Sequence, residues 1–127
     1  MSITDLAKAV GMSAPSVNER IKRLEENGVI LGYRVAVDPV VIGYPLMAIL
    51  RIRQHPGKAR QLEALMASIP EFVECDKVTG EDCYIARLYL KDISQLDPIT
   101  DEIAQFGDTN TAIVKSTPIK RRLLSLR

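Results

Sequence analysis

The order of apolar patterns after residue 45 limits the fold of this chain more than any other sequence feature. Four segments have the alternating or continuous apolar pattern that is typical of β-strands. We expect these strands at about residues 45–53, 72–78, 84–91 and 110–117. Two stretches between them have apolar residues at every third or fourth position, which predicts helices.

Each expected helix carries one apolar stripe. The inward side chains of the first helix are Leu62, Leu65, Met66 and Ile69. Those of the second helix, at about residues 93–106, are Leu96, Ile99, Ile103 and Phe106. Pro70 is expected to stop the first helix and Gly107 to end the second. The order is strand, helix, strand, strand, helix, strand. It predicts an α+β fold in which two helices cover one face of a four-stranded sheet, the ferredoxin-like βαββαβ sandwich.

A break near residue 40 separates this part of the chain from an N-terminal segment. Residues 38–39 (Asp-Pro) open the break, and residues 43–45 (Gly-Tyr-Pro) close it. We therefore expect one domain at residues 1–38 and a second at residues 45–127, joined by a linker at residues 39–44.

The N-terminal segment predicts two short helices. Thr4 is expected to cap the first helix and Gly11 to end it. Ser13 is expected to cap the second helix, with Pro15 tolerated in its first turn and Gly28 ending it. The inward side chains are Leu6, Ala7 and Val10 in the first helix and Val17, Ile21 and Leu24 in the second.

A tight glycine-containing turn between two short helices is typical of the helix-turn-helix, whose second helix enters the major groove of DNA. Two short strands, expected at residues 29–31 and 33–37 around Gly32, would add a hairpin wing along the DNA backbone. The whole chain has a net charge of only +1, so DNA binding requires a local basic patch. Residues 13–24 supply one, because they hold three cations and one anion.

The expected DNA contacts lie along this second helix, at its cap and on the wing. They are Ser13, Ala14, Pro15, Ser16, Asn18, Glu19, Arg20, Lys22, Arg23 and Arg34. Ser16 and Asn18 can hydrogen-bond to base edges, whereas Arg20 and Arg23 can reach a guanine or a phosphate. On spacing alone, a plain helical hairpin with a solvated charged face remains the alternative.

Several runs of residues together resemble the Lrp/AsnC family, the feast/famine transcription regulators of bacteria and archaea. These runs are residues 6–13 (LAKAVGMS), Val17, residues 20–25 (RIKRLE), 28–33 (GVILGY), 38–39 (DP), Gly43, 78–84 (VTGEDCY) and 109–114 (TNTAIV). Each run alone is weak, but the combination is specific and covers essentially the whole chain.

The resemblance implies a winged helix-turn-helix joined to a ferredoxin-like sensing domain. It implies dimers that bind pseudo-palindromic promoter sites on double-stranded DNA, and rings of dimers, often octamers. It also implies a small effector, commonly an amino acid, enclosed between subunits. The residues at the expected effector loops are Gly80, Glu81, Asp82, Cys83, Tyr84, Thr109, Asn110 and Thr111.

The chemistry of these loops suits an amino acid. Glu81 or Asp82 could hold an ammonium group, and free backbone N–H groups could take a carboxylate. An ordinary solvated turn is the alternative from the residues alone. Members of the family often have Gly-Asp-x-Asp here, whereas this chain has Gly80-Glu81-Asp82-Cys83, which changes the placement of the acids.

A second departure concerns the start of the chain. Family members usually have another helix before the position of Met1, which completes the DNA-binding core. We therefore expect either that the chain is a fragment or an internal start, or that another chain covers the inward face of its two helices. The alternative function is a small-molecule sensing and oligomerisation module that does not bind DNA.

The predicted sheet is apolar on both faces. Met47, Ile49, Ile85 and Tyr89, or their alternates, remain on the face that the helices do not cover. Such a sheet usually has a partner on its second face, so we expect a homo-oligomer.

Composition argues against other classes of protein. Hydrophobic residues make up 46% and charged residues 26%, as in ordinary globular proteins. The N-terminus lacks a secretory signal and no apolar run approaches a membrane span, so we expect a cytoplasmic protein without a membrane partner. Cys75 and Cys83, expected as free thiols, and His55, expected in an exposed turn, are too few for a zinc site. We expect no metal, no cofactor and no enzymatic activity, because the usual catalytic motifs are missing from the sequence.

Overall fold

The structure, a computed structural model, describes residues 3–125 except for the side chains of Ile3 and Leu6. The chain separates into two units, Met1–Ala36 and Val37–Arg127. Within the described residues, no helix is long and apolar enough to cross a membrane.

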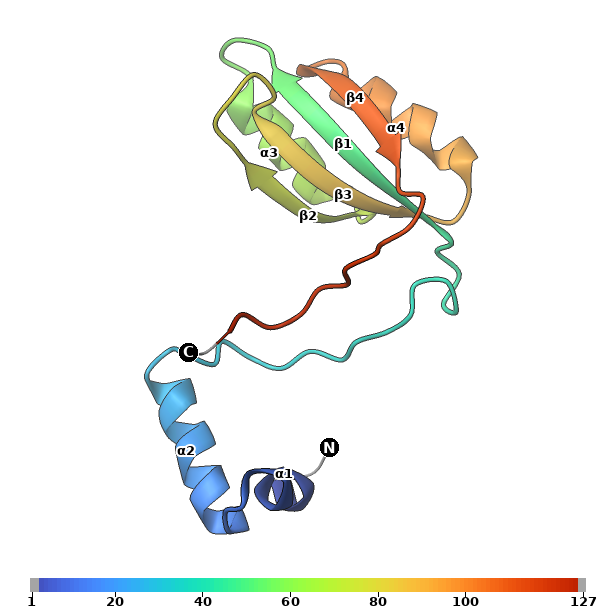
Figure 1. Cartoon of the computed structure of the whole chain (residues 1–127). Coiled ribbons are helices and arrows are strands. Elements are labelled where there is room, and N and C mark those ends of the chain that lie inside the picture. Colours follow the sequence, from blue (N-terminus) through green and yellow to red (C-terminus); the bar gives the residue numbers. More distant parts are fainter. Residues whose placement is uncertain (1–2, 126–127) are drawn as a thin grey trace. The chain divides into compact units, whose positions relative to one another are not determined.

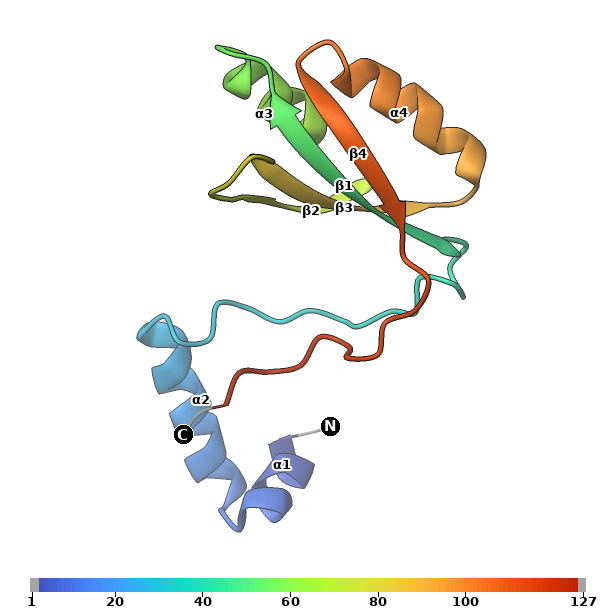
Figure 2. The ribbon, with the colours of Figure 1, turned by 45° about the horizontal axis from the view of Figure 1, so that its top comes forward.

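The second unit is a four-stranded antiparallel sheet with two helices on one face (Figures 1 and 2). Its elements, in chain order, are β1 (Leu46–Gln54), α3 (Ala59–Ser68), β2 (Phe72–Lys77), β3 (Tyr84–Leu90), the 3-10 helix η1 (Ile93–Gln95), α4 (Leu96–Ile103) and β4 (Gly107–Ile113). The strand order is β2-β3-β1-β4, so β1 and β3 are central and β2 and β4 are edges. This is the expected ferredoxin-like arrangement.

The core of this unit lies between the sheet and the two helices. Its buried side chains are Ala48, Leu50 and Ile52 from β1, Tyr84, Ala86, Leu88 and Leu90 from β3, and Leu62, Met66, Ile99 and Ile103 from the helices. The remaining members of the expected stripes, Leu65, Ile69, Leu96 and Phe106, are partly buried against this core. The three-to-four spacing thus predicted the helix side of this core correctly, whereas the sequence left open which face of each strand the helices cover.

The last helix and the last strand begin and end at other residues than expected. The expected helix at residues 93–106 is a 3-10 turn followed by α4, which ends at Ile103. Gly107 does not end the helix: it is the first residue of β4, and that strand ends at Ile113 instead of residue 117. The glycine lets β4 approach β1 closely, because a Cβ atom there would lie 2.8 Å from the carbonyl oxygen of Arg53.

The first unit consists of α1 (Ile3–Val10) and α2 (Ala14–Glu26), joined by a tight turn. Gly11 occupies this turn with a φ of 69°, a left-handed conformation that favours glycine. Ser13 caps α2, and its side-chain oxygen accepts a hydrogen bond from the backbone N–H of Ser16 at 3.3 Å. Pro15 lies in the first turn of α2 and Gly28 follows its end, as expected.

Three expectations for this unit differ from the structure. Thr4 lies inside α1 and does not cap it. Val10 and Leu24, expected to face inward, are 54% and 40% exposed, whereas Ala7 and Val17 are buried. The expected inward position of Leu6 lies outside the described side chains. The two helices alone therefore cover only part of the apolar stripes, because each stripe is wider than one helix-helix contact.

The expected hairpin wing is wrong: residues 30–38 form no strand and run as an extended segment (Figure 1). The expected strands left only Gly32 between them, whereas the tightest common hairpins have two-residue loops with at least one residue of positive φ. Gly32 has no positive φ angle. The hydroxyl of Tyr33 instead donates a hydrogen bond to the carboxylate of Glu25 at the end of α2.

Candidate functional site

The expected DNA-reading residues form the exposed surface of α2. Ala14 is half-buried; the exposed members are Ser13, Pro15, Ser16, Asn18, Glu19, Arg20, Lys22 and Arg23. Arg23 Nη2 forms an ion pair with Glu19 Oε1 at 2.8 Å, one helical turn away. Arg20 and Lys22 have no ion-pair partner among the described residues, so these two cations are available to an anionic partner.

The first turn of α2 is already engaged within the protein. The Ser13 hydroxyl donates a hydrogen bond to the Ser16 hydroxyl at 2.9 Å while it accepts one from the Ser16 backbone. Arg34 lies in the extended segment after α2, where it is exposed and has no ion-pair partner in the described part of the chain. The structure therefore gathers the α2 residues on one surface and does not bring Arg34 to a wing beside them.

The two expected effector segments lie at the same end of the sheet, on either side of β1. Ile52 of β1 is paired with Tyr84 of β3 on one side and with Thr109 of β4 on the other. The two segments are thus two strand spacings apart, about 10 Å, within one chain.

The turn at residues 79–83 is held from the sheet face that the helices leave open. The Val78 N–H donates a hydrogen bond to the Cys83 carbonyl at 2.7 Å, which closes the base of the turn. Arg53 of β1 donates from Nε to the Glu81 carbonyl at 3.1 Å, and its Nη2 lies 3.2 Å from Glu81 Oε2. Asp82 is half-buried and makes no hydrogen bond or ion pair with another described residue. Of the two acids, Asp82 is therefore the one without a side-chain partner among the described residues.

The expected residues of β4 divide between the two faces of the sheet. Thr109 and Thr111 are paired with the buried residues Ile52 and Leu50, so they lie on the helix face and are half-buried. Asn110 is exposed and is paired with Arg51, so both lie on the open face. Asn110, Arg51 and Arg53 thus share one surface at this end of the sheet.

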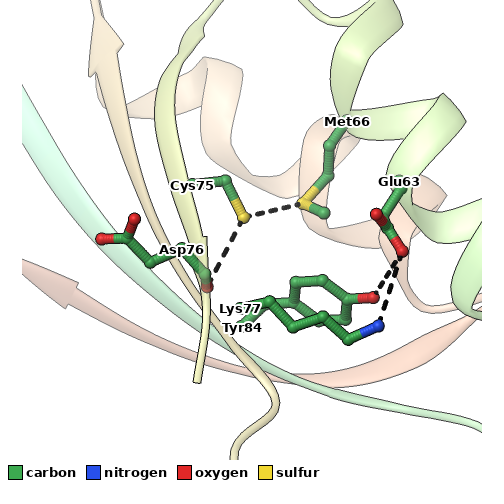
Figure 3. A network of polar contacts seen from close by, with 6 residues as sticks. All are labelled: Glu63, Met66, Cys75, Asp76, Lys77 and Tyr84. Carbon is green, nitrogen blue, oxygen red and sulfur yellow. Dashed lines mark hydrogen bonds and ion pairs between the residues drawn. The ribbon is translucent and has the colours of Figure 1, made fainter.

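Tyr84 lies on the helix face and is only 2% exposed. Its hydroxyl donates a hydrogen bond to Glu63 Oε2 of α3 at 2.9 Å, and Lys77 Nζ lies 5.5 Å from the centre of its ring (Figure 3). Burial, followed by the hydrogen bond to Glu63, raises the pKa of Tyr84 to about 12. Tyr84 therefore stays neutral at physiological pH and serves as a donor to Glu63.

Sequence reasoning missed Arg51, Arg53 and Glu63. The signal for the two arginines was present, since both alternate with the buried Leu50 and Ile52 in β1, which places them on the opposite face. No sequence signal links Glu63 to the turn, because the contact joins α3 to β3.

His55 and the acidic residues of β2 also have partners in the fold. His55 is half-buried, not exposed as expected, and its Nε2 lies 3.3 Å from Asp108 Oδ1. Glu74 Oε2 lies 3.7 Å from Arg87 Nε. Within the part of the chain that the structure describes, no three His, Cys, Asp or Glu side chains are grouped so as to hold a metal ion.

Comparison with protein families identifies both units. A family model described as the Lrp/AsnC ligand binding domain matches residues 47–124. The chain belongs to the Lrp/AsnC family. A second model, described as winged helix-turn-helix DNA-binding, matches residues 1–30. The resemblance found in the sequence runs is thus confirmed.

Individual relatives of the Lrp/AsnC family agree with this assignment. The chain is 30% identical to the leucine-responsive regulatory protein of Haemophilus influenzae, over 100% of this chain and 81% of that protein. It is 28% identical to the HTH-type transcriptional regulator FL11 of Pyrococcus horikoshii, over 91% of this chain and 78% of the relative. These relatives are named as regulators and not as enzymes, in line with the expectation of a transcription regulator without enzymatic activity.

Solved structures of the Lrp/AsnC family have the same fold. A feast or famine regulatory protein from M. tuberculosis, complexed with L-methionine, superposes with a TM-score of 0.84 at 26% identity. The match covers 97% of this chain and 86% of that chain. The expected α+β architecture of a helix-turn-helix unit and a ferredoxin-like unit is confirmed by this likeness.

Proposed function

We propose that this chain regulates transcription by binding double-stranded DNA through α2, under the control of an amino acid or a related metabolite. The observation that carries the proposal is the exposed surface of α2. This helix follows the glycine turn at Gly11 and carries Arg20 and Lys22, which have no ion-pair partner among the described residues. A transcription regulator must lie in the compartment that contains the DNA, so we also propose that the protein is cytoplasmic.

The DNA contacts that we propose divide by chemistry. Ser16 and Asn18 are short polar side chains near the N-terminal end of α2, which is the end that enters the major groove. Arg20 and Lys22 are free to contact a phosphate or a guanine, whereas Arg23 would first have to leave Glu19. The remaining candidates on this surface are Ser13, Ala14, Pro15 and Glu19, and Arg34 would act from the extended segment.

The proposed effector site is the end of the sheet at residues 80–83 and 109–111. Glu81 is paired with Arg53 and its side chain is 90% exposed, whereas Asp82 is half-buried, so Asp82 is the carboxylate that we assign to the effector's ammonium group. Arg51 and the backbone N–H groups around Gly80 are available to its carboxylate. Tyr84, Thr109 and Thr111 support the site from the helix face.

We also propose that the chain acts as a homodimer and that dimers associate further, up to an octamer. The open face of the sheet supports this proposal, since Met47, Ile49, Ile85 and Tyr89 are only half-buried there. A second copy covering this face would bury them and would present two α2 helices to a pseudo-palindromic site.

Fluorescence anisotropy of the chain with labelled DNA from upstream of its own gene tests the proposal at fixed salt, with and without a mixture of amino acids. We expect tighter binding to this DNA than to unrelated DNA, and a change in affinity or oligomer size when the amino acids are added. No preference for the upstream DNA, together with an amino-acid response, would instead favour a sensing module that does not bind DNA.

Substitution of Arg20 by Ala gives the experiment a residue-level readout. If Arg20 contacts a phosphate, the slope of log affinity against log salt should fall by about one in R20A. Arg60→Ala, on the exposed surface of α3 in the other unit, is the matched control and should leave the slope unchanged. Equal salt slopes for R20A and the wild type would contradict a phosphate contact by Arg20.

A further inference from the structure

We propose that Glu63 of α3 is the positioning residue of the effector turn: it holds both ends of the turn from the helix face and thereby sets effector affinity. The inference rests on the proposed function, because it assigns a role to Glu63 at the same effector site. Glu63 lies outside the turn and outside β4, so it supports the site without being one of its proposed ligands.

The geometry places one carboxylate at the base of the turn. Lys77 is the last residue of β2 and Tyr84 is the first residue of β3, so these two residues flank residues 78–83. Glu63 Oε2 accepts the hydrogen bond of the Tyr84 hydroxyl at 2.9 Å and lies 3.8 Å from Lys77 Nζ (Figure 3). The same oxygen atom therefore contacts both residues at which the turn begins and ends.

The contact with Tyr84 is the stronger of the two. Lys77 and Glu63 have side chains that are 59% and 53% exposed, so their ion pair at 3.8 Å is screened by water. Tyr84, in contrast, is 2% exposed and is paired with Ile52 in the sheet, so its hydroxyl has little freedom to find another partner. Lys77 contributes a second contact, because its ammonium also lies over the Tyr84 ring.

The turn is thus held from both faces of the sheet. Arg53 holds Glu81 from the open face, and Glu63 holds Lys77 and Tyr84 from the helix face. Gly80, between these anchors, has a φ of 121°, a conformation that other residues rarely adopt. Without Glu63, Tyr84 loses its hydrogen-bond acceptor and Lys77 loses its ion-pair partner, and the turn spends less time in the conformation that presents Asp82.

Amide hydrogen exchange in the absence of any amino acid tests whether Glu63 holds the turn. We expect exchange at the Val78 amide, whose N–H donates to the Cys83 carbonyl at the base of the turn, to be roughly five- to tenfold faster in Glu63→Ala than in the wild type, the size expected for the net loss of one ordinary hydrogen bond. Glu63→Gln keeps an acceptor oxygen for Tyr84 and should retain most of the protection. Exchange at Leu50 and Leu88, in the centre of the sheet, should not change.

Glu74→Ala is the matched control. Glu74 is a carboxylate of β2 whose ion pair, with Arg87, lies away from the turn. This variant should leave exchange at the Val78 amide unchanged. Turn exchange in Glu63→Ala that equals the wild-type value overturns the proposal, whatever the protein binds.

Calorimetric titration with each of the 20 standard amino acids, with L-methionine among them, tests the effect on affinity. For an amino acid that binds the wild type, Glu63→Ala should bind roughly five- to tenfold more weakly, and Glu63→Gln should recover most of that loss. Faster turn exchange with unchanged affinity also overturns the proposal. If the wild type binds none of them, the amino-acid part of the proposed function fails, and the exchange experiment still reports whether Glu63 holds the turn.

Discussion

Tyr84 shows how a single residue can belong to the core and to a candidate site at once. The sequence placed it in the effector turn, and the structure buries its ring on the helix face while its hydroxyl reaches Glu63. A buried tyrosine hydroxyl needs a partner, since an unpaired one costs about 1–3 kcal/mol. Glu63 supplies that partner, and so the packing of the core fixes where β3 begins.

Ionisation of Tyr84 predicts a loss of stability in alkali. Its pKa is about 12 in the folded protein and 10.0 for an unperturbed tyrosine, so both states are protonated below pH 10. Between pH 10 and pH 12 the unfolded chain loses this proton first, which favours unfolding. We expect the wild type to lose up to about 2 kcal/mol relative to Tyr84→Phe as the pH rises from 9.5 to 12, measured by urea unfolding. A constant difference between the two proteins across this range would contradict the assignment.

The approach of β4 to β1 depends on the absence of a side chain at one position. A Cβ atom at Gly107 would lie 2.8 Å from the Arg53 carbonyl oxygen and 2.9 Å from Cγ2 of Ile52, both closer than ordinary van der Waals contact. We expect Gly107→Ala to lower the free energy of unfolding of the second unit by about 1–3 kcal/mol, because the central strand is rigid and must shift. Urea unfolding followed by tyrosine fluorescence measures this change.

Gly32→Ala is the matched control for that substitution. Gly32 has no positive φ angle, and nothing lies within 4 Å of a Cβ atom built there. Its replacement should change stability by no more than about 0.5 kcal/mol. Similar losses for both variants would show that the close contact with β1 is not the cause.

At the scale of elements, the sequence predicted the interior of each helix and strand better than its ends. The spacing of Leu62 and Met66 is a property of the helix itself, so it can be read without the rest of the fold. The prediction that Gly107 ends the helix was wrong because glycine occurs in two structural contexts: after the end of a helix, and where two strands approach closely. The structure distinguishes the two contexts, because the carbonyl oxygen of Arg53 lies next to Gly107. The hairpin wing was wrong for a similar reason, since strand-like residues form strands only where a partner strand is available.

The whole molecule presents a sheet with one covered and one open face. Ile49, at the centre of the open face, is half-buried, and a second copy would bury it further. We expect the wild type to sediment as a dimer or a larger assembly, and Ile49→Lys to sediment as a monomer, because a buried unpaired charge is strongly unfavourable at an interface. Ala64→Lys, on the exposed side of α3, is the control and should keep the wild-type assembly. An unchanged sedimentation coefficient for Ile49→Lys would show that the copies associate elsewhere.

The residues of the candidate site could be identified only from the sequence and the structure together. Family-like runs indicated residues 80–84 and 109–111. The sequence analysis missed Arg51 and Arg53, although their alternation with Leu50 and Ile52 in β1 places both arginines on one face of the strand. The contact of Glu63 with the turn could not be predicted, because it depends on how α3 lies across the sheet. Likewise, the division of Thr109 and Asn110 between the two faces follows from the register of β4 with β1.

Strand β2 forms an edge of the sheet, and the backbone N–H and C=O groups on its outer side can pair with a strand of another molecule. Two features discourage such pairing in a crowded cell: an irregularity in the ladder between Phe72 and Glu74, and the charged side chains Glu74, Asp76 and Lys77. Replacement of these charged side chains by apolar ones would leave the outer edge of β2 open to pairing with a strand of another molecule. The charges of β2 therefore act against the association of molecules through this edge of the sheet.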